Sequence, residues 1–365
     1  MNNFYHSKYA IGTTRPKKGK SNTYRVFSII LLLILIVAAG TGYYIYNTMF
    51  TPNTWTPKDE PASLYIHPGA VFEDVKHDLY ANGLIVNRRS FEWLANQKNY
   101  PGAVKKGHYE IKQGMSNNEL LNMLKAGIEK PVNVVFHNVR TLPELTERVS
   151  SQLIFEKDDL TQLLKDSAYL ETHGFDTVTV KTMFIPNTYE FYWTTETKPF
   201  FERMYDEYER FWTEERRKKA EEAELTLAEV STLASIVDRE TNKNDEKARI
   251  AGVYMNRLER GWRLQADPTL VFAVGDFSIK RVLNKHKRID SPYNTYQNRG
   301  LPPGPICIPA ISSLDAVLNY EDHNYMYFSA KPDFSGYHVF ARTNAEHQQN
   351  ARAYQKALNE RKIFE

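Results

Sequence analysis

One apolar segment constrains this chain more than any other feature of its sequence. From Val26 to Met49 the sequence contains no charged residue and is rich in Leu, Ile, Val and Ala. An α-helix of that length measures about 36 Å, which exceeds the bilayer hydrocarbon thickness of about 30 Å. We therefore predict a transmembrane anchor at 26–49, since a buried core helix would not need the basic cluster that precedes this one.

The charge around this segment predicts its orientation. Six basic residues and no acidic one lie in the first 25 positions, and three tyrosines lie near the far end of the apolar run. Basic flanks favour the cytoplasm and tyrosines favour the interface, so we expect a cytoplasmic tail at 1–25. A cleaved signal peptide is the alternative, with Ala38-Ala39-Gly40 as its exit, but the apolar run continues to Met49. We predict a single-pass protein of the inner (cytoplasmic) membrane whose body lies outside the cytoplasm.

The body of the chain is faintly acidic. The chain has 47 basic and 44 acidic residues, and without the six basic residues of the tail the balance is 41 against 44. This charge gives no reason to expect a nucleic-acid partner. With Cys307 as the only cysteine, the fold has no internal disulfide to stabilise it.

Hydrophobic periodicity and the positions of helix- and strand-breaking residues predict an α+β organisation after the anchor. Residues 50–61 contain three prolines and suggest a stiff linker. Residues 62–136 then indicate a small module with the order strand, helix, helix, strand, helix, strand. Residues 137–365 form the last predicted domain, which is mainly helical and includes one long charged helix at 200–224.

Several helix starts can be predicted from capping patterns. Ser116 and Glu119 have the spacing of a capping box, as do Thr141 and Glu144, and Ser90 is a candidate N-cap.

Glu240 is the strongest candidate for chemistry. It lies seven residues beyond Leu233 and three beyond Val237, on the apolar stripe of a predicted helix, whereas Asp238 is about 200° round that helix from it. Burial and the negative end of the helix dipole would both raise its pKa, and a protonated carboxyl can donate to a glycosidic oxygen. The alternative is an ordinary helix-end glutamate in water, or one paired with Arg239 or Arg257.

Three later loops carry amides, hydroxyls and aromatic rings, which suit carbohydrate: 263–269, 292–296 and 300–306. Ordinary loop chemistry predicts similar residues. Metal and nucleotide motifs such as H-E-x-x-H, the P-loop and the Rossmann glycines do not occur, so we predict no metal and no cofactor.

Taken in order, these segments resemble one family. The segments are ASIVDRET at 234–241, RLQADPT at 263–269, YNTY at 293–296 and GLPPGPI at 300–306, after a basic tail and an anchor. This order resembles the endolytic murein transglycosylases of the MltG (YceG-like) family. The resemblance implies a LysM-like module at 62–136 and a transglycosylase catalytic domain at 137–365.

The resemblance also implies an activity and its residues. The chain would be a lytic transglycosylase that cleaves MurNAc-β-1,4-GlcNAc bonds inside peptidoglycan strands, leaves 1,6-anhydro-MurNAc ends, and acts on nascent strands. Glu240 matches the catalytic acid of the family. The substrate-binding positions are Gln265, Asp267, Asn294, Thr295 and Tyr296. Glycan strands and the membrane are the expected partners, with peptidoglycan synthases as further candidates.

Two segments depart from the family pattern. Lys181-Thr182 and Asn187 stand where the family usually has Glu-Gly and an aspartate. Two alternatives therefore stay open: a non-catalytic peptidoglycan-binding scaffold, and a muramidase-type hydrolase that pairs Glu240 with Asp267 or Glu190.

Overall fold

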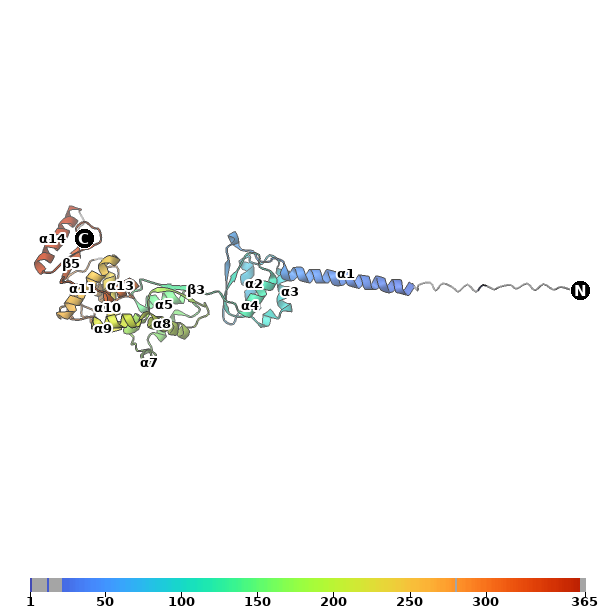
Figure 1. The fold of residues 1–365 in the computed structure, drawn as a ribbon, viewed down its shortest axis with the longest axis horizontal. Helices are drawn as coiled ribbons and strands as arrows, with labels where there is room; N and C mark the ends of the chain where they lie inside the picture. Colours follow the sequence, from blue (N-terminus) through green and yellow to red (C-terminus); the bar gives the residue numbers. More distant parts are fainter. Residues whose placement is uncertain (2–11, 13–21, 280, 362–365) are drawn as a thin grey trace. The chain divides into compact units, whose positions relative to one another are not determined.

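The structure is a computed structural model that describes residues 1, 12, 22–279 and 281–361. It divides into two compact units, residues 1–128 and residues 129–365 (Figure 1). Helices and antiparallel strand pairs occur in both units, so the predicted α+β class is confirmed at that level. Apart from residues 1, 12 and 22–25, the predicted cytoplasmic tail lies outside the described residues.

The predicted anchor forms the helix α1 (Asn22–Phe50). Residues Thr23–Phe50 are long and apolar enough to cross a membrane, with a mean hydropathy of 2.5. Large apolar side chains along the helix are exposed, from Val26 at 54% to Val37 at 66%. A helix that is apolar on all sides and covered by no other part of its unit is consistent with a single-pass membrane anchor.

The rest of the first unit is a small module around one antiparallel strand pair. Strand β1 pairs with β2, with Leu64 opposite Tyr109 in the register. Buried side chains from the strands and from three helices share one core. The elements are β1 (Ala62–Ile66), α2 (Phe72–Ala81), α3 (Arg88–Gln97), β2 (Gly107–Ile111) and α4 (Asn117–Ala126), with short 3₁₀ turns η1 (Pro57–Asp59) and η2 (Tyr100–Gly102).

The helix starts of this module agree with the sequence in one case and differ in another. Ser116 caps α4 in the predicted capping box, because its hydroxyl accepts from the Glu119 N–H and Glu119 accepts from the Ser116 N–H. The prediction of Ser90 as a cap is wrong. Helix α3 begins three residues earlier, and the side chain of Asn87 accepts from the Ser90 N–H.

The predicted linker is built into the module instead of bridging two separate parts. Asn53 is 5% exposed, and its side-chain amide donates to Asn117 Oδ1 at 2.6 Å. Asn117 in turn donates to the carbonyl of Thr48 in α1 at 2.9 Å. These buried amides join the end of the apolar helix directly to α4. The end of the apolar helix and the module therefore belong to the same compact unit.

The second unit contains the remaining elements. They are β3 (Val132–Phe136), α5 (Leu142–Ser150), α6 (Lys157–Leu163), α7 (Ser167–Glu171), η3 (Thr179–Met183), β4 (Asn187–Phe191), α8 (Thr197–Phe211), α9 (Glu214–Glu222), α10 (Leu227–Glu240), α11 (Asn244–Glu259), α12 (Asp267–Val274), η4 (His286–Arg288), α13 (Ile311–Leu318), β5 (Tyr327–Ala330), β6 (His338–Ala341) and α14 (Asn344–Glu360).

Two boundaries differ from those expected. The strand at 132–136 was expected to complete the small module, but β3 pairs with β4 of the second unit, with Val134 opposite Tyr189. The compact units accordingly divide at 128 and not at 136. The long helix expected at 200–224 is two helices, because Trp212 turns into the core at 1% exposed and Thr213 caps α9.

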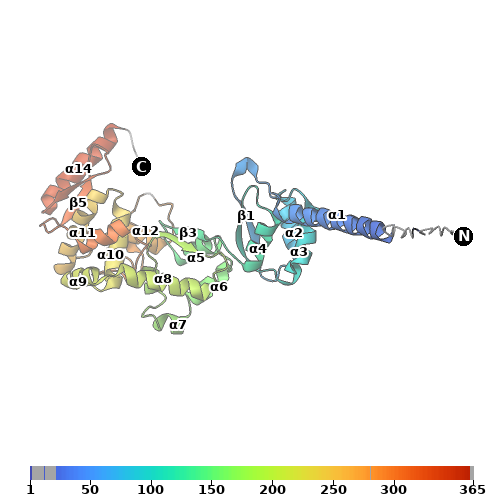
Figure 2. The same cartoon turned by 45° about the vertical axis from the view of Figure 1, so that its right-hand side comes forward.

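Three helices form the part of the second unit that matters most for the site. Helix α10 packs against α11 and α13, and its residues from Val230 to Val237 are all buried. The hairpin β5–β6 packs against α14, and the two lie side by side in Figure 2. Buried apolar side chains of α10, α11 and α13 belong to a single large core, and Phe328 and Phe340 of the hairpin pack on it.

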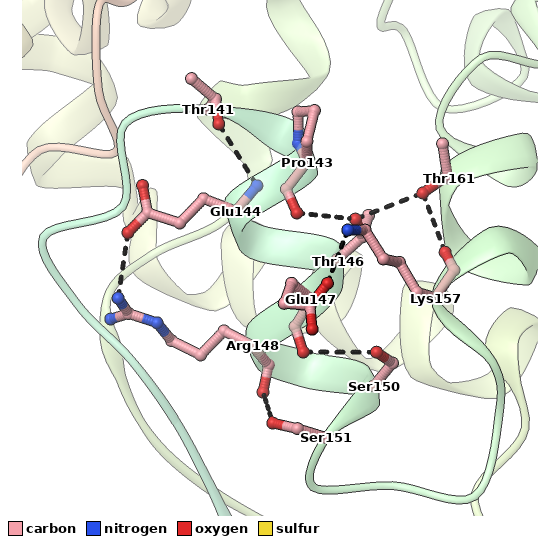
Figure 3. Close-up of polar contacts among 10 residues, drawn as sticks. All are labelled: Thr141, Pro143, Glu144, Thr146, Glu147, Arg148, Ser150, Ser151, Lys157 and Thr161. Carbon is pink, nitrogen blue, oxygen red and sulfur yellow. Dashed lines mark hydrogen bonds and ion pairs between the residues drawn. The ribbon is translucent and has the colours of Figure 1, made fainter. Parts of the chain in front are cut away.

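Helix α5 shows how local capping sets the start of an element. Thr141 accepts from the Glu144 N–H at 3.2 Å, as its capping position requires (Figure 3). Glu144 does not complete the box; one carboxylate oxygen accepts from the Arg140 N–H at 2.9 Å and the other binds Arg148 at 3.0 Å. Arg140 is thereby held in place just before the helix.

Candidate active site

Glu240 ends helix α10, where the apolar stripe of that helix meets a cavity. The preceding stripe is fully buried, with Leu233 and Val237 at 0% exposed. From the adjacent helix α11, the Tyr254 hydroxyl donates to Glu240 Oε1 at 2.6 Å. Tyr254 is itself 1% exposed, so the core holds this donor in one position. The alternative of a helix-end glutamate surrounded by water is wrong.

The surroundings of Glu240 raise the pKa of its carboxyl from 4.5 to about 7. Burial is the largest cause, and the negative charge of Asp267 acts in the same direction. The Tyr254 hydrogen bond and the positive charge of Arg257 oppose the shift because they favour the ionised form. A carboxyl with a pKa near 7 exchanges a proton readily at neutral pH, as a general acid–base group must.

Asp238 belongs to a different environment although it is only two residues away. Its carboxylate accepts from Ser313 Oγ at 2.6 Å and forms an ion pair with Lys247 at 3.2 Å. Both partners of that ion pair are nearly buried, at 5% for Lys247 and 9% for Asp238. Asp238 therefore ties α10 to α11 and α13, and Glu240 is the one of the two that faces the cavities.

Two cavities meet at Glu240. The first has a volume of about 450 Å³ and the second about 440 Å³, and Glu240 and Asp267 line both. The second is lined by aromatic and amide side chains, namely Tyr254, Gln265, Tyr296, Tyr327, Phe328, Asn344 and Gln348, together with Arg257 and His347. Aromatic faces with amides at their edges suit sugar rings. Binding space on both sides of one acid suits a polymer cleaved within its length.

Three of the predicted substrate-binding residues line the second cavity. Asp267 is exposed in the first turn of α12, where it accepts from the Tyr296 hydroxyl at 2.6 Å. Gln265 precedes the helix with a φ of +51°, a left-handed conformation that a residue with a side chain adopts at a cost. Such conformations concentrate at functional sites, and here it is held by the Gln265 N–H bonding to the Thr295 carbonyl at 3.1 Å.

The other two predicted residues are buried and do not reach the cavities. Asn294 is 0% exposed, and its side chain donates to the Lys287 and Ile289 carbonyls. Thr295 is 1% exposed; its hydroxyl accepts from the Ala266 N–H at 3.0 Å. Direct sugar contact by these side chains is therefore excluded. They shape the loop that carries Gln265 and Tyr296.

Sequence reasoning missed several residues of the site. Tyr254 lies mid-helix, 14 residues after Glu240, and nothing local marks it as a partner. The alternative in which Glu240 pairs with an arginine is not observed, since neither Arg239 nor Arg257 bonds to Glu240 within the described residues. Arg257 instead donates to the Met326 carbonyl at 2.9 Å and to the Leu264 carbonyl.

The two departures from the family pattern lie away from Glu240. Lys181 is 7% exposed and donates to the Pro305 carbonyl at 2.9 Å, and burial lowers its pKa to about 8. Asn187 is exposed on β4, opposite Phe136. Neither residue is among those lining the two cavities, so the acid and its surroundings remain complete.

Among the described residues, no group of three or more His, Cys, Asp or Glu side chains is arranged to hold a metal ion. Cys307 is buried, and burial raises the pKa of its thiol to about 12, so it is no nucleophile at neutral pH.

The fold and the site define a class of protein: an α+β chain with one N-terminal helix long and apolar enough to cross a membrane, in which one acid lines two cavities suited to sugar rings. Comparison with known sequences agrees. The YceG-like family model matches residues 64–353, and the chain belongs to that family.

Curated relatives carry a single name. A protein named endolytic murein transglycosylase from Bacillus subtilis is 27% identical over 88% of this chain and 92% of its own length. One of the same name from Streptococcus pneumoniae is 25% identical over 89% of this chain and 64% of its own length. A crystal structure of a yceG-like protein from Listeria monocytogenes matches with a TM-score of 0.55 and 27% identity over 80% of this chain and 98% of that one.

Proposed function

We propose that this chain is a membrane-anchored lytic transglycosylase of peptidoglycan. It cleaves MurNAc-β-1,4-GlcNAc bonds within glycan strands and leaves 1,6-anhydro-MurNAc ends. Family membership and the shared name of the relatives support this proposal. The observation that carries it is the Glu240 carboxyl, whose pKa is about 7 and which faces two cavities at once.

The chemistry needs one carboxyl that acts twice. Protonated Glu240 donates its proton to the bridging oxygen, and the bond from MurNAc C1 to that oxygen breaks. The resulting carboxylate then takes the proton of the C6 hydroxyl, whose oxygen bonds to C1. No water is consumed and Glu240 ends protonated again, so no second carboxyl is required to activate water.

The neighbours of Glu240 support both halves of this cycle. Burial stabilises the protonated form that begins the reaction. The Tyr254 hydroxyl stabilises the carboxylate formed in the middle of it, since it donates to Oε1 at 2.6 Å. Gln265, Asp267 and Tyr296 line the second cavity, where they position the sugar.

Purified glycan strands test this proposal directly. Digestion should release fragments with 1,6-anhydromuramoyl ends, which mass spectrometry distinguishes from reducing ends by the mass of one water. Glu240→Gln should lower the rate by about 10²–10⁴, the usual contribution of a general acid. Glu259→Gln, an exposed helix-end glutamate of α11, is the matched control and should keep the rate. Strand binding without cleavage by the unaltered chain would instead identify a scaffold.

A muramidase-type hydrolase is the second candidate because one further carboxylate, Asp267, lines the same two cavities. Glu190, the other proposed base, is exposed on β4 and lines neither of them. Reducing ends in the digest, together with incorporation of ¹⁸O from labelled water, would establish the hydrolase and reject the transglycosylase.

The placement at the membrane is also part of the proposal. The tail would lie in the cytoplasm, and the module and catalytic unit outside it, on the outer face of the inner membrane. There the enzyme would meet nascent strands and the synthases that make them.

The orientation can be tested with a single accessible cysteine. Cys307 is buried, whereas the side chain of Val86 is 70% exposed, so the cysteine of a Val86→Cys variant reports the topology. An impermeant maleimide should label it in intact spheroplasts; labelling only after lysis would reverse the orientation.

A further inference from the structure

The two cavities beside Glu240 differ sharply in charge. The first is lined by three arginines, Arg140, Arg239 and Arg281, together with Glu240 and Asp267. Its remaining walls are largely apolar, as with Phe272, Phe277 and Val271. The second cavity has a single arginine, and that residue is bound to backbone carbonyls. Only the first cavity therefore presents an excess of positive charge that is not committed elsewhere.

The arginines of the first cavity lack anionic partners. Among the described residues, neither Arg239 nor Arg281 forms an ion pair or a hydrogen bond. The guanidinium of Arg140 contacts the Phe277 carbonyl at 3.4 Å and lies 4.8 Å from the Phe277 ring, but no carboxylate binds it. Burial and the neighbouring Arg239 lower the pKa of Arg140, whereas the Glu144 carboxylate acts in the opposite direction. Two like charges held close together, with no carboxylate bonded to either guanidinium in the described structure, favour an anion from outside.

The placement of Arg140 and Arg239 is set by the fold rather than by chance rotation of long side chains. Arg239 directly precedes the acid in the last turn of α10. The Arg140 N–H is fixed by the Glu144 carboxylate at 2.9 Å, at the start of α5. The last turn of α10 and the residue just before the N-cap of α5 therefore bring two arginines to the lining of one cavity. A guanidinium presents a planar fork of donors that matches a carboxylate or phosphate, which a lysine cannot offer.

We propose that the first cavity is a binding subsite for a carboxylate carried by the glycan strand, held by Arg140 and Arg239 beside the scissile bond. This inference rests on the proposed function and makes it more specific. The sugar units of such a strand are uncharged, and its negative charge lies on the lactyl group of muramic acid or on the peptide attached to that group. Both sources offer the same chemistry, a carboxylate.

Binding to the Glu240→Gln variant tests the subsite without cleavage. The ligands are defined muramoyl oligosaccharides in two forms, one bearing peptides and one stripped of them so that the lactyl carboxylate is free. Each form is compared with a copy whose carboxyls have been converted to methylamides. We expect at least one free-carboxylate form to bind about tenfold more tightly than its capped copy, as hydrogen bonds to a charged group predict. The form that shows the difference identifies the source.

Substitutions then assign the preference to the arginines. In the Glu240→Gln background, Arg239→Gln should remove most of the preference for free carboxylates, whereas Arg239→Lys should retain part of it. Arg210→Gln is the control, because Arg210 lies on α8 and pairs with Glu207 at 2.8 Å. Arg140→Gln should act like Arg239→Gln. The retained binding of capped ligands by each variant shows that it is folded.

The outcomes separate this inference from the proposed function. Equal binding of free and capped ligands, or an undiminished preference in both glutamine variants, would overturn the subsite even if the unaltered enzyme makes 1,6-anhydro ends. A carboxylate preference that the arginine variants lose, in a chain that cleaves nothing, would support the subsite and reject the lytic activity.

Discussion

At the scale of single residues, the site depends on the contrast between two acids of one helix. Asp238 forms an ion pair with Lys247, accepts a hydrogen bond from Ser313, and works as a structural tie. Glu240 has no basic side chain bonded to it in the described structure and receives one hydrogen bond, from Tyr254. Burial then raises the Glu240 pKa to about 7. Two positions along a helix separate a structural carboxylate from the candidate acid because they face different neighbours.

The Tyr254 hydroxyl should set the alkaline limit of activity. Glu240 must be protonated to begin the reaction, so the rate should fall as pH rises through about 7. The Tyr254 hydrogen bond lowers the Glu240 pKa, and Tyr254→Phe removes it. The alkaline limb of kcat/KM against pH should therefore move to higher pH in this variant. A limb that stays in place, or moves to lower pH, would contradict the role assigned to this contact.

Ionisation of Glu240 should also lower the free energy of unfolding at alkaline pH. Its pKa is about 7 in the folded chain and 4.5 as the ordinary value, so the folded state loses stability as pH rises through that interval. Glu240→Gln cannot ionise and escapes the loss. Its melting temperature relative to the parent should be higher at pH 8 than at pH 4.5. For Glu259→Gln, the difference in melting temperature from the parent should not change across the same pH range. If it also does not change for Glu240→Gln, the raised pKa of Glu240 is contradicted.

At the scale of elements, the site is held by the junction between helix α12 and the loop at 291–298. Thr295 is the centre of that junction: its hydroxyl accepts from the Ala266 N–H and bonds the Thr269 hydroxyl at 2.8 Å. Its carbonyl holds Gln265 in the left-handed conformation. The loop therefore determines where Asp267 enters the cavities.

Thr295→Val should test this junction because it preserves shape and removes the hydroxyl. The buried Ala266 N–H would lose its acceptor, which costs about 1–3 kcal/mol of the free energy of unfolding. Misplacement of Asp267 and Gln265 should raise KM as well. Chemical denaturation and strand-cleavage kinetics measure the two effects. The control is Thr188→Val, since Thr188 is exposed on β4, and it should change the free energy of unfolding by less than about 0.5 kcal/mol. An equal loss of unfolding free energy in both variants would contradict the role assigned to Thr295.

At the scale of the whole molecule, the anchor and the module act as one body. The Asn117 amide binds the Thr48 carbonyl at the end of α1, and Asn53 binds Asn117. Residues 51–56 run through the module and are partly buried within it. The module is therefore bonded directly to the end of the apolar helix α1.

Removal of the apolar helix should separate location from chemistry. A chain that begins at Asn47 keeps the Thr48 carbonyl and with it the buried contact to Asn117. It should appear in the soluble fraction and cleave soluble strands with an unchanged kcat/KM, since Glu240 and its cavities lie in the other unit. Membrane association of this shortened chain, measured by flotation with vesicles, would show that the anchor is not the sole membrane contact.

Local patterns in the sequence were sufficient for the features that depend on neighbours within a few residues. The apolar run predicted α1, and the Ser116–Glu119 spacing predicted a capping box. The stripe from Leu233 placed Glu240 on the apolar face of a predicted helix, while an ordinary helix-end glutamate stayed open as the alternative. The LysM-like nature of the module stays a prediction. Local pattern misplaced the start of α3 by three residues, since Asn87 and not Ser90 is its N-cap. It also failed where a distant segment competes, as when β3 paired with β4.

The sequence by itself determined the long apolar helix, the mixed helix-and-strand class and the family, because periodicity and motif spacing are properties of the chain alone. The tertiary structure decided which side chains surround Glu240. It brought Tyr254 onto Glu240, withdrew Asn294 and Thr295 into the loop, paired β3 with β4, and gathered three arginines on one side of the cleft. Those contacts join residues far apart along the chain, and only packing of the whole unit selects them.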